Sequence, residues 1–335
     1  MDLSKYLRFS SLWLLALFSL CTVIAQAQTC LTSSDMDEPT RSALESTAKR
    51  YFDMAALGDV AALKQSAIPS LAANFSSVES AVKDSQASFA GAQARPHPPF
   101  LLKVEGDKPL GRAEFLCGVF GKNGQTANSA AFVIPNLAPN TYGVVSLEIP
   151  GAQAKTVSFV LQRQGPDWKI GGFYVHASQL AGHDADWFAD QARAFKSKGQ
   201  KGDAWLYYLE ARELAVPVPF MYTQVTDKLY DESQAVKPGD FPLDGNTVDL
   251  QVAGRIYKLT ALSPVAVDQE LDVVVKYQAS DVSHTAETFK DNMAVIHALV
   301  ARYPELRGAF GGVVARAVEP SGQDYGSMLP MKEIK

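Results

Sequence analysis

Hydrophobic and polar residues alternate along residues 141–177, and glycine or proline interrupts the alternation at 150–151 and again at 165–167. A period of two is typical of strands with one buried face, and such dipeptides are typical of tight turns. The pattern therefore predicts three consecutive antiparallel strands that form the central sheet of a first domain. The residues expected to face a helical layer are Val145, Leu147, Val157, Phe159, Leu161 and Ile170.

The preceding residues, 35–91, follow the helical period instead. Apolar residues recur every three or four positions over 40–57, Gly58 is a natural stop, and Asp59 is a natural cap for a short helix over 60–67. A third helix is expected to start at Ser70. Its apolar stripe contains Leu71, Phe75, Val78, Val82 and Phe89.

The period changes from helix to strand after the proline-rich segment 94–100, which reads as a stiff, extended connector. Strands are expected over 100–105, 113–120 and 130–134, before the alternating stretch, and the last strand over 168–175 contains a glycine pair that indicates a bulge. Helices followed by a run of antiparallel strands predict the α+β fold class.

Two segments carry a resemblance to a known family. Residues 51–63, YFDMAALGDVAAL, and 165–175, GPDWKIGGFYV, resemble the nuclear transport factor 2-like superfamily, whose cone-shaped α+β fold also occurs in ketosteroid isomerases and polyketide cyclases. The resemblance covers residues 36–177. It implies a curved sheet bent around helices, with a pocket at the open end of the cone. Members catalyse reactions there, bind ligands or serve as assembly modules, so the fold by itself does not define a function.

The second half of the chain is expected to hold two further parts. Residues 178–236 are helical, and the spacing of Phe195, Gly199, Ala204, Tyr208 and Ala211 resembles one tetratricopeptide-like hairpin, with a third helix over 220–231. Trp187, Trp205, Tyr207 and Tyr208 are expected to dock this connector on a neighbouring domain, and the alternative is a surface that binds a partner or a sugar.

Residues 237–335 begin with a linker at 237–246 and continue as a smaller α+β domain of order β-β-β-α-β. Its helix is predicted over 285–302, with Phe289, Met293, Ile296, Leu299 and Val300 facing inward. Strands are predicted over 247–252, 255–262, 271–278 and 312–318.

Composition and charge exclude some classes of protein. Hydrophobic residues make up 47% of the 335 residues and charged residues 20%, which is a globular composition, and the net charge of −5 argues against nucleic-acid binding and attachment to anionic membranes. Residues 1–27 have a basic start, an apolar run and an Ala-Gln-Ala end, so they predict a cleaved signal peptide and a periplasmic or secreted protein. The alternative is an uncleaved anchor, although the run is short of the about 20 residues that a membrane span needs.

Two cysteines, Cys30 and Cys117, follow the predicted cleavage site. An even pair in an oxidising compartment favours a disulfide, which would attach the N-terminal tail to the sheet. The alternative is that Cys117 is a buried free thiol and Cys30 has no partner. A catalytic thiol is disfavoured because no histidine lies near either cysteine in the sequence.

Candidate chemistry is sparse. The segment 183–186, His-Asp-Ala-Asp, offers three potential metal ligands, but an aspartate before a helix more often caps it, so neither a metal nor a cofactor is expected. The candidates for a pocket rim are Tyr51, His176 and His183. An enzyme would need an acid or base held in an apolar pocket, whereas Asp53, Glu114 and Glu148 are expected to point to solvent.

These features favour an exported, non-catalytic binding or assembly module that takes an unknown small ligand or protein partner and forms a homodimer. The alternative hypothesis is a small-molecule enzyme, isomerase- or cyclase-like, that uses the pocket of the cone. The two differ in whether a titratable side chain points into an enclosed pocket.

Overall fold

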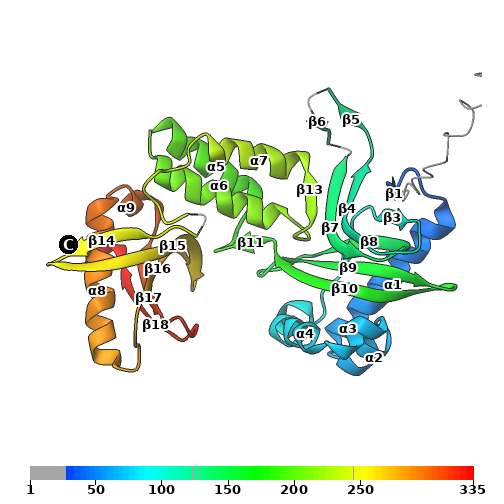
Figure 1. Ribbon diagram of the computed structural model, residues 1–335, viewed down its shortest axis with the longest axis horizontal. Helices are drawn as coiled ribbons and strands as arrows, with labels where there is room; N and C mark the ends of the chain where they lie inside the picture. The colour runs from blue at the N-terminus through cyan, green and yellow to red at the C-terminus, as the bar shows by residue number, and fades with distance from the viewer. Residues whose placement is uncertain (1–27, 123, 128, 244) are drawn as a thin grey trace, which may run out of the picture.

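The computed structural model describes residues 28–122, 124–127, 129–243 and 245–335, and the predicted signal peptide lies outside them. The described chain is an α+β protein, as predicted (Figure 1). Three hydrophobic cores hold it together: one under the N-terminal helices, one between two sheets, and one shared by the helical hairpin and the C-terminal part.

Four helices cover one face of the N-terminal part: α1 (Glu38–Ala56), α2 (Val60–Gln65), α3 (Pro69–Ala73) and α4 (Ser76–Phe89). Asp37 caps α1 by accepting a hydrogen bond from the Thr40 amide, and Asp59 caps α2 as predicted. The single third helix predicted from Ser70 is wrong. The backbone of Asn74 leaves the helical region at φ −127° and ψ 50°, and the chain starts again as α4 so that Phe75 is buried.

The larger N-terminal sheet, sheet A, has the strand order β1-β3-β8-β9-β10, with β2 paired on β8. Its strands are β1 (Gln28–Leu31), β2 (Arg95–Pro96), β3 (Phe100–Val104), β8 (Asn140–Ile149), β9 (Lys155–Gln164) and β10 (Asp167–Ala177). The last three are the predicted meander. The register of β10 against β9 shifts between Ile170 and Gly172, which confirms the bulge that the glycine pair indicated.

The face of sheet A that meets the helices is a closed core. The six residues predicted to face inward are all 0% exposed, and they pack against Leu44, Tyr51 and Phe52 of α1. One buried polar bond crosses the layers: the Tyr51 hydroxyl donates to the Trp168 carbonyl at 2.7 Å. The expected contact between the meander and the helices is therefore confirmed, and the space between them is filled by side chains.

A second, three-stranded sheet, sheet B, lies on the other face of sheet A. It has the order β13-β7-β4 and consists of β4 (Leu110–Cys117), β7 (Ala130–Leu137) and β13 (Met221–Thr223); a short hairpin, β5 (Phe120–Gly121) and β6 (Gly124–Gln125), lies between β4 and β7. Phe115 and Phe132 of sheet B pack on Leu102 and Val144 of sheet A. The strands predicted near 113–120 and 130–134 therefore exist but belong to a separate sheet.

The middle segment contains β11 (Gln179–Leu180), β12 (His183–Asp184), α5 (Ala185–Ser197), α6 (Lys201–Ala215) and α7 (Gln224–Gln234). The third helix starts at Gln224, later than predicted, because the chain first returns to the N-terminal part as β13 and pairs with β7 (Figure 1). Helix α6 is buried on most sides. Trp205, Tyr207 and Tyr208 pack in the core shared with the C-terminal part, which confirms the predicted docking.

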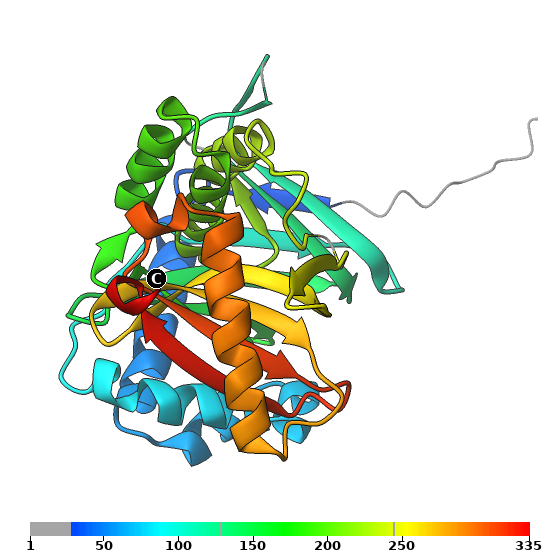
Figure 2. The same ribbon diagram turned by 90° about the vertical axis from the view of Figure 1, so that its left-hand side faces the viewer.

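The C-terminal sheet has the order β14-β15-β16-β17-β18. Its strands are β14 (Val248–Val252), β15 (Arg255–Val267), β16 (Glu270–Gln278), β17 (Gly312–Val318) and β18 (Asp324–Pro330); α8 (Thr285–Arg302) and α9 (Leu306–Ala309) connect β16 to β17, and a 3₁₀ turn (Met331–Glu333) follows β18. Figure 2 shows α8 lying across this sheet. The strand β18 and the helix α9 were not predicted.

The predicted inward face of α8 is partly wrong. Phe289 is 47% exposed, whereas Thr288 and Asn292 are buried. Asn292 accepts a hydrogen bond from the Tyr277 hydroxyl and donates to the Ser327 hydroxyl, so two polar residues occupy the inner stripe and rotate Phe289 outward. Among the described residues, no helix has both the length and the apolar character that a membrane crossing requires.

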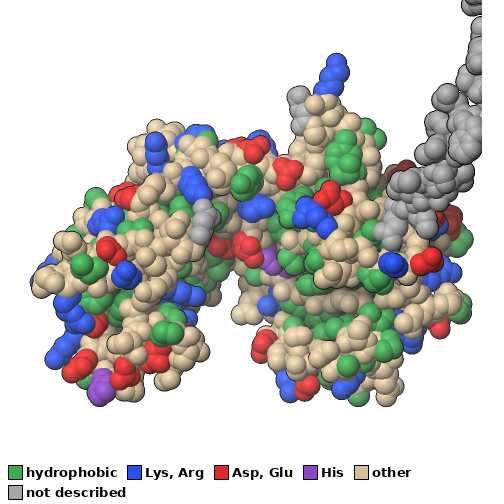
Figure 3. Space-filling model, viewed as in Figure 1, with side chains coloured by type: hydrophobic (Ala, Val, Ile, Leu, Met, Phe, Trp, Pro, Cys, Tyr) green, Lys and Arg blue, Asp and Glu red, His purple; other side chains and the backbone are tan. Residues whose placement is uncertain are grey.

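The boundaries predicted between the three parts stay a prediction, and two strands cross them. β1 precedes residue 36 and β13 lies within 178–236, yet both are hydrogen-bonded into the N-terminal sheets. Figure 3 shows two lobes separated by a notch, with the helical hairpin joining them above it. The hairpin of α5 and α6 shares its hydrophobic core with the C-terminal lobe. The last turn of α6, at Leu214 and Ala215, lines the groove of the N-terminal lobe.

Candidate functional site

A groove of about 860 Å³ lies on the face of sheet A that the N-terminal helices do not cover. Three separate segments border it. They are the turn after β1, the segment 97–100 before and into β3, and the connector between α6 and β13; residues between β4 and β7 complete the border. The helix-facing side of sheet A is packed with apolar side chains, and this cavity lies on the opposite side of the same sheet.

Alternate residues of β8 and β9 form the floor of the groove. Val144, Ser146 and Thr156 point into it, because their neighbours Val145 and Leu147 point into the helix-facing core. Beside the floor, Ser146 and the fully buried Ser158 are hydrogen-bonded at 2.8 Å between their hydroxyl oxygens. Ser158 also donates to the Pro217 carbonyl at 3.1 Å, which connects the sheet to the far wall.

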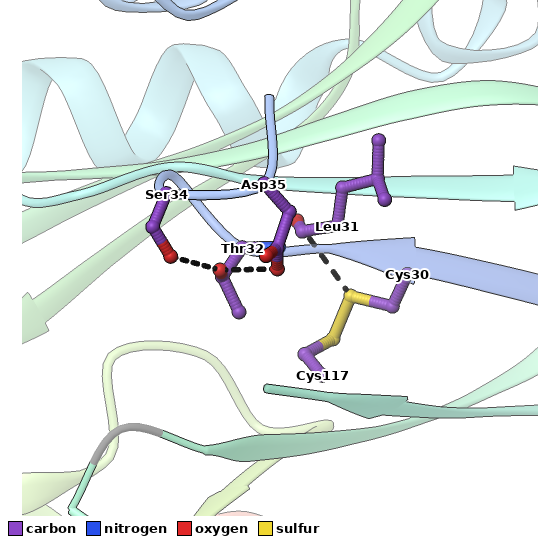
Figure 4. The surroundings of a disulfide bond; sticks show 6 residues. All are labelled: Cys30, Leu31, Thr32, Ser34, Asp35 and Cys117. Carbon is purple, nitrogen blue, oxygen red and sulfur yellow. Dashed lines mark hydrogen bonds between the residues drawn. A yellow bond between two sulfur atoms is a disulfide. The ribbon is translucent and has the colours of Figure 1, made fainter. Parts of the chain in front are cut away.

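The turn from Thr32 to Asp35 forms one lip of the groove. The Asp35 carboxylate accepts from the Thr32 hydroxyl at 2.5 Å and from the Thr32 amide at 3.1 Å (Figure 4). These two bonds, the hydroxyl first, hold the pKa of Asp35 below its ordinary value, so its carboxylate is ionised at neutral pH. Arg41 lies nearby, paired with Glu38 and donating to the Ser33 carbonyl.

A disulfide between Cys30 and Cys117 stands at the same end of the groove (Figure 4). It joins β1 at the edge of sheet A to β4 at the edge of sheet B, across Cα atoms 5.1 Å apart. Thr32 and Gly118, which follow the two cysteines closely, both line the groove. The predicted bridge is therefore present, and it ties together two opposing walls of the cavity.

The far wall is the connector from Leu214 to Thr223. It is held on sheet A by the Ser158 bond, by an edge-to-face contact of Tyr174 with Phe220 at 5.6 Å, and by His176, whose Nε2 donates to the Glu213 carbonyl at 2.5 Å. His176 thus anchors this wall from outside.

The three predicted rim candidates do not come together. Tyr51 is 1% exposed in the helix-facing core, His176 lies behind the far wall, and His183 stacks on Trp187 with ring centroids 3.7 Å apart. Asp184 accepts from the Trp187 amide and caps α5, as predicted. No group of three or more potential metal ligands occurs in the part of the chain that the structure describes.

The carboxylates weighed as catalytic candidates lie elsewhere. Asp53 is exposed on α1 beside Lys49, Glu114 is exposed on β4 beside Arg112, and Glu148 is half-buried outside the groove. The histidine that does line the groove is His97, whose backbone amide donates to the Ser146 carbonyl. The proline-rich segment around His97 was predicted only as a stiff connector. The histidine between its prolines was the available signal.

Two acids with strongly raised pKa values lie outside the groove, on α6. Burial, with the nearby charge of Glu305, raises the pKa of Asp203 to about 7, and burial, with Glu213, raises the pKa of Glu210 to about 7. Asp203 is 0% exposed, and neither of its oxygens has a hydrogen-bond partner among the described residues. These two acids make α6 a region of unusual electrostatics within the fold.

Comparison with protein-family models, with curated proteins and with solved structures finds no match to this chain. The assignment of a function therefore rests on the groove, its hydrogen bonds and its charges.

Proposed function

We propose that this chain is an exported, non-catalytic binding protein whose ligand occupies the groove between sheets A and B. The observation that carries the proposal is the cavity itself. Its volume of about 860 Å³ lies within the about 300–1,000 Å³ typical of sites for small molecules. Its lining mixes apolar side chains such as Phe100 and Val144 with a few convergent polar groups, which is the usual composition of a ligand site.

The arrangement of the polar groups favours binding over catalysis. On the floor of the groove, Ser146 and Ser158 bond to each other and to a main-chain carbonyl rather than to the base that a nucleophilic hydroxyl needs. An isomerase- or cyclase-like enzyme would need an acid or base in the cone between the helices and sheet A. That space holds packed leucine and phenylalanine side chains, which argues against the enzyme alternative.

Two features support export to the periplasm or the cell exterior. The first is the sequence pattern of residues 1–27, and the second is the cysteine pair, because disulfides persist in oxidising compartments. A relationship to the nuclear transport factor 2-like superfamily is also proposed. It is supported by the helices packed on the meander of β8, β9 and β10, and sheet B would then be an addition to that fold. The homodimer stays a prediction.

The proposal is tested by filling the groove. The protein is exported to a bacterial periplasm, purified without reduction and analysed by native mass spectrometry for a co-purified molecule, which is then extracted and identified. Ala215→Trp places an indole on the far wall and is expected to remove the bound mass. Ala286→Trp, in the exposed first turn of α8, is the matched control and should retain it.

A bound molecule that persists in Ala215→Trp and disappears in the control would contradict the assignment to the groove. A protein that carries no molecule, and whose thermal unfolding responds to no compound in a broad metabolite screen, would contradict the binding function itself.

A further inference from the structure

The positions of the hydroxyl protons on the groove floor can be assigned. A carbonyl oxygen only accepts, so the Ser158 hydroxyl donates its single proton to the Pro217 carbonyl. Ser158 must then accept in its bond with Ser146, and Ser146 uses its own proton to make that bond. Ser146 therefore presents only oxygen lone pairs to the groove, and it can bind a ligand group that donates a hydrogen bond.

The hydroxyl protons of the turn at 32–35, which forms the lip of the groove, can be assigned as well. Thr32 donates its hydroxyl proton to the Asp35 carboxylate, so Ser34, whose hydroxyl oxygen is 2.9 Å from that of Thr32, must donate to Thr32 (Figure 4). The hydroxyl protons of Thr32 and Ser34 are thus both directed within the turn. What the turn offers outward is the charge of Asp35, which is exposed and ionised.

The arginine at the groove does not cancel its preference for ligands that donate hydrogen bonds. Arg41 is paired with Glu38 and donates to the Ser33 carbonyl. On the opposite wall, the Thr223 hydroxyl accepts from the Thr226 amide. His97 lies between the two ends, with its amide bonded to the Ser146 carbonyl. Near Ser146 and near Asp35, the groove is equipped to accept hydrogen bonds.

We propose that the ligand of the groove carries a protonated amine that binds at Asp35, and a second N–H or O–H donor that binds Ser146, with its apolar part against Phe100 and Val144. This inference rests on the proposed binding function. Two sources share the chemistry: the free amino terminus of a peptide, whose amide N–H groups supply the second donor, and an alkylamine. A carboxylate ligand is disfavoured, because it would face the Asp35 carboxylate and find no donor at Ser146.

Four probes separate these alternatives: n-octylamine, n-octanoate, tetra-alanine amide with a free amino terminus, and the same peptide with an acetylated amino terminus. Each is titrated at pH 7 into the oxidised mature chain, and its dissociation constant is measured by ligand-observed NMR. We expect octylamine to bind at least 10-fold more tightly than octanoate, and acetylation to weaken the peptide at least 10-fold. Whichever binds more tightly, octylamine or the peptide with the free amino terminus, identifies the ligand as an alkylamine or a peptide.

Octanoate binding as tightly as octylamine, together with an acetylated peptide as tight as the free one, would overturn the inference while leaving the binding function in place. Failure of all four probes, in a protein that retains a co-purified molecule in its groove, would also overturn it. Failure of all four in a protein without any such molecule would remove the proposed function as well.

Variants test the two acceptors separately. Asp35→Asn removes the charge and is expected to weaken octylamine at least 10-fold, whereas Asp53→Asn, at an exposed acid on α1, should leave binding unchanged. Thr32→Val breaks the turn's hydroxyl bonds but keeps the charge, so it should retain the preference for octylamine over octanoate. Ser158→Ala frees the Ser146 proton for donation and should reduce that preference. An unchanged preference in both Asp35→Asn and Ser158→Ala would overturn the proposal.

Discussion

The same strands form both faces of sheet A, but one face packs against the N-terminal helices and the other lines the groove. Val145 and Leu147 are 0% exposed beneath the helices, while Val144 and Ser146, their immediate neighbours, line the groove. Alternation along a strand separates the two sets, because successive side chains point to opposite faces. One face can therefore be closed by apolar packing while the other carries polar groups for a ligand, and substitutions on one face should affect stability and those on the other binding.

The largest difference between the two faces should appear on truncating a core side chain. Phe159→Ala removes a fully buried ring from the helix-facing core and is expected to lower the free energy of unfolding by about 4 kcal/mol, from lost burial and the cavity left behind. Val160→Ala, at the next position and only half-buried on the groove side, should cost about 1 kcal/mol. Urea unfolding followed by tryptophan fluorescence measures both. Equal losses would show that the two faces are equivalent in packing.

Removing the disulfide tests whether the groove side depends on a covalent link that the helix side lacks. Cys30→Ser with Cys117→Ser opens a loop between residues 87 positions apart and should lower the free energy of unfolding by about 3 kcal/mol. It should also weaken ligand binding, because the two lips are no longer joined. Addition of a reductant to the natural sequence should reproduce both changes. A stability that does not respond to reduction would contradict this role.

The buried polar groups of α6 differ from those of the groove floor. Ser146 and Ser158 on the floor are hydrogen-bonded, whereas the Asp203 carboxylate on α6 has no hydrogen-bond partner among the described residues. Burial raises the pKa of Asp203 to about 7, above an unfolded value of about 4, so the carboxyl stabilises the fold at low pH and loses that contribution as the pH rises through 7. Between pH 5 and pH 9 this carboxyl alone should lower the free energy of unfolding by about 2 kcal/mol.

Asp203→Asn should remove the part of this fall that Asp203 contributes, because the amide cannot ionise. Urea unfolding at pH 5, 7 and 9 provides the measurement. Glu210→Gln is the companion variant, because the pKa of Glu210 is also raised to about 7. If neither variant changes the pH dependence of stability, the α6 acids are not its source.

Local patterns in the sequence were sufficient to predict the elements that have one face in an apolar core and the other in a polar environment. The period of two identified the strands of the meander and the residues that they bury, and glycine, proline and aspartate marked the turns, the bulge and the caps of α2 and α5. Prediction failed where polar residues are buried. The face of α8 was displaced because Thr288 and Asn292 face inward, and only the hydroxyls of Tyr277 and Ser327 make that placement of Asn292 favourable.

The candidate site was predictable only in fragments. The cysteine pair at one end of the groove was recognised, but the family resemblance implied a pocket only at the open end of the cone, and no pattern in the sequence indicated the groove on the other face of sheet A. Its walls come from the turn at 32–35, the segment around His97 and the connector that ends in β13, which are far apart in the sequence. None of these segments has a motif of its own, so no spacing rule brings them together.

The sequence by itself determined the α+β class and the two faces of the meander, because both depend on periodicity, and it favoured the pairing of Cys30 with Cys117 without deciding it. Only the tertiary structure decided that sheet B packs on the second face of sheet A and that the groove lies on that face as well. That outcome depends on β13 returning to pair with β7, a contact between strands about 90 residues apart whose stability comes from packing in three dimensions.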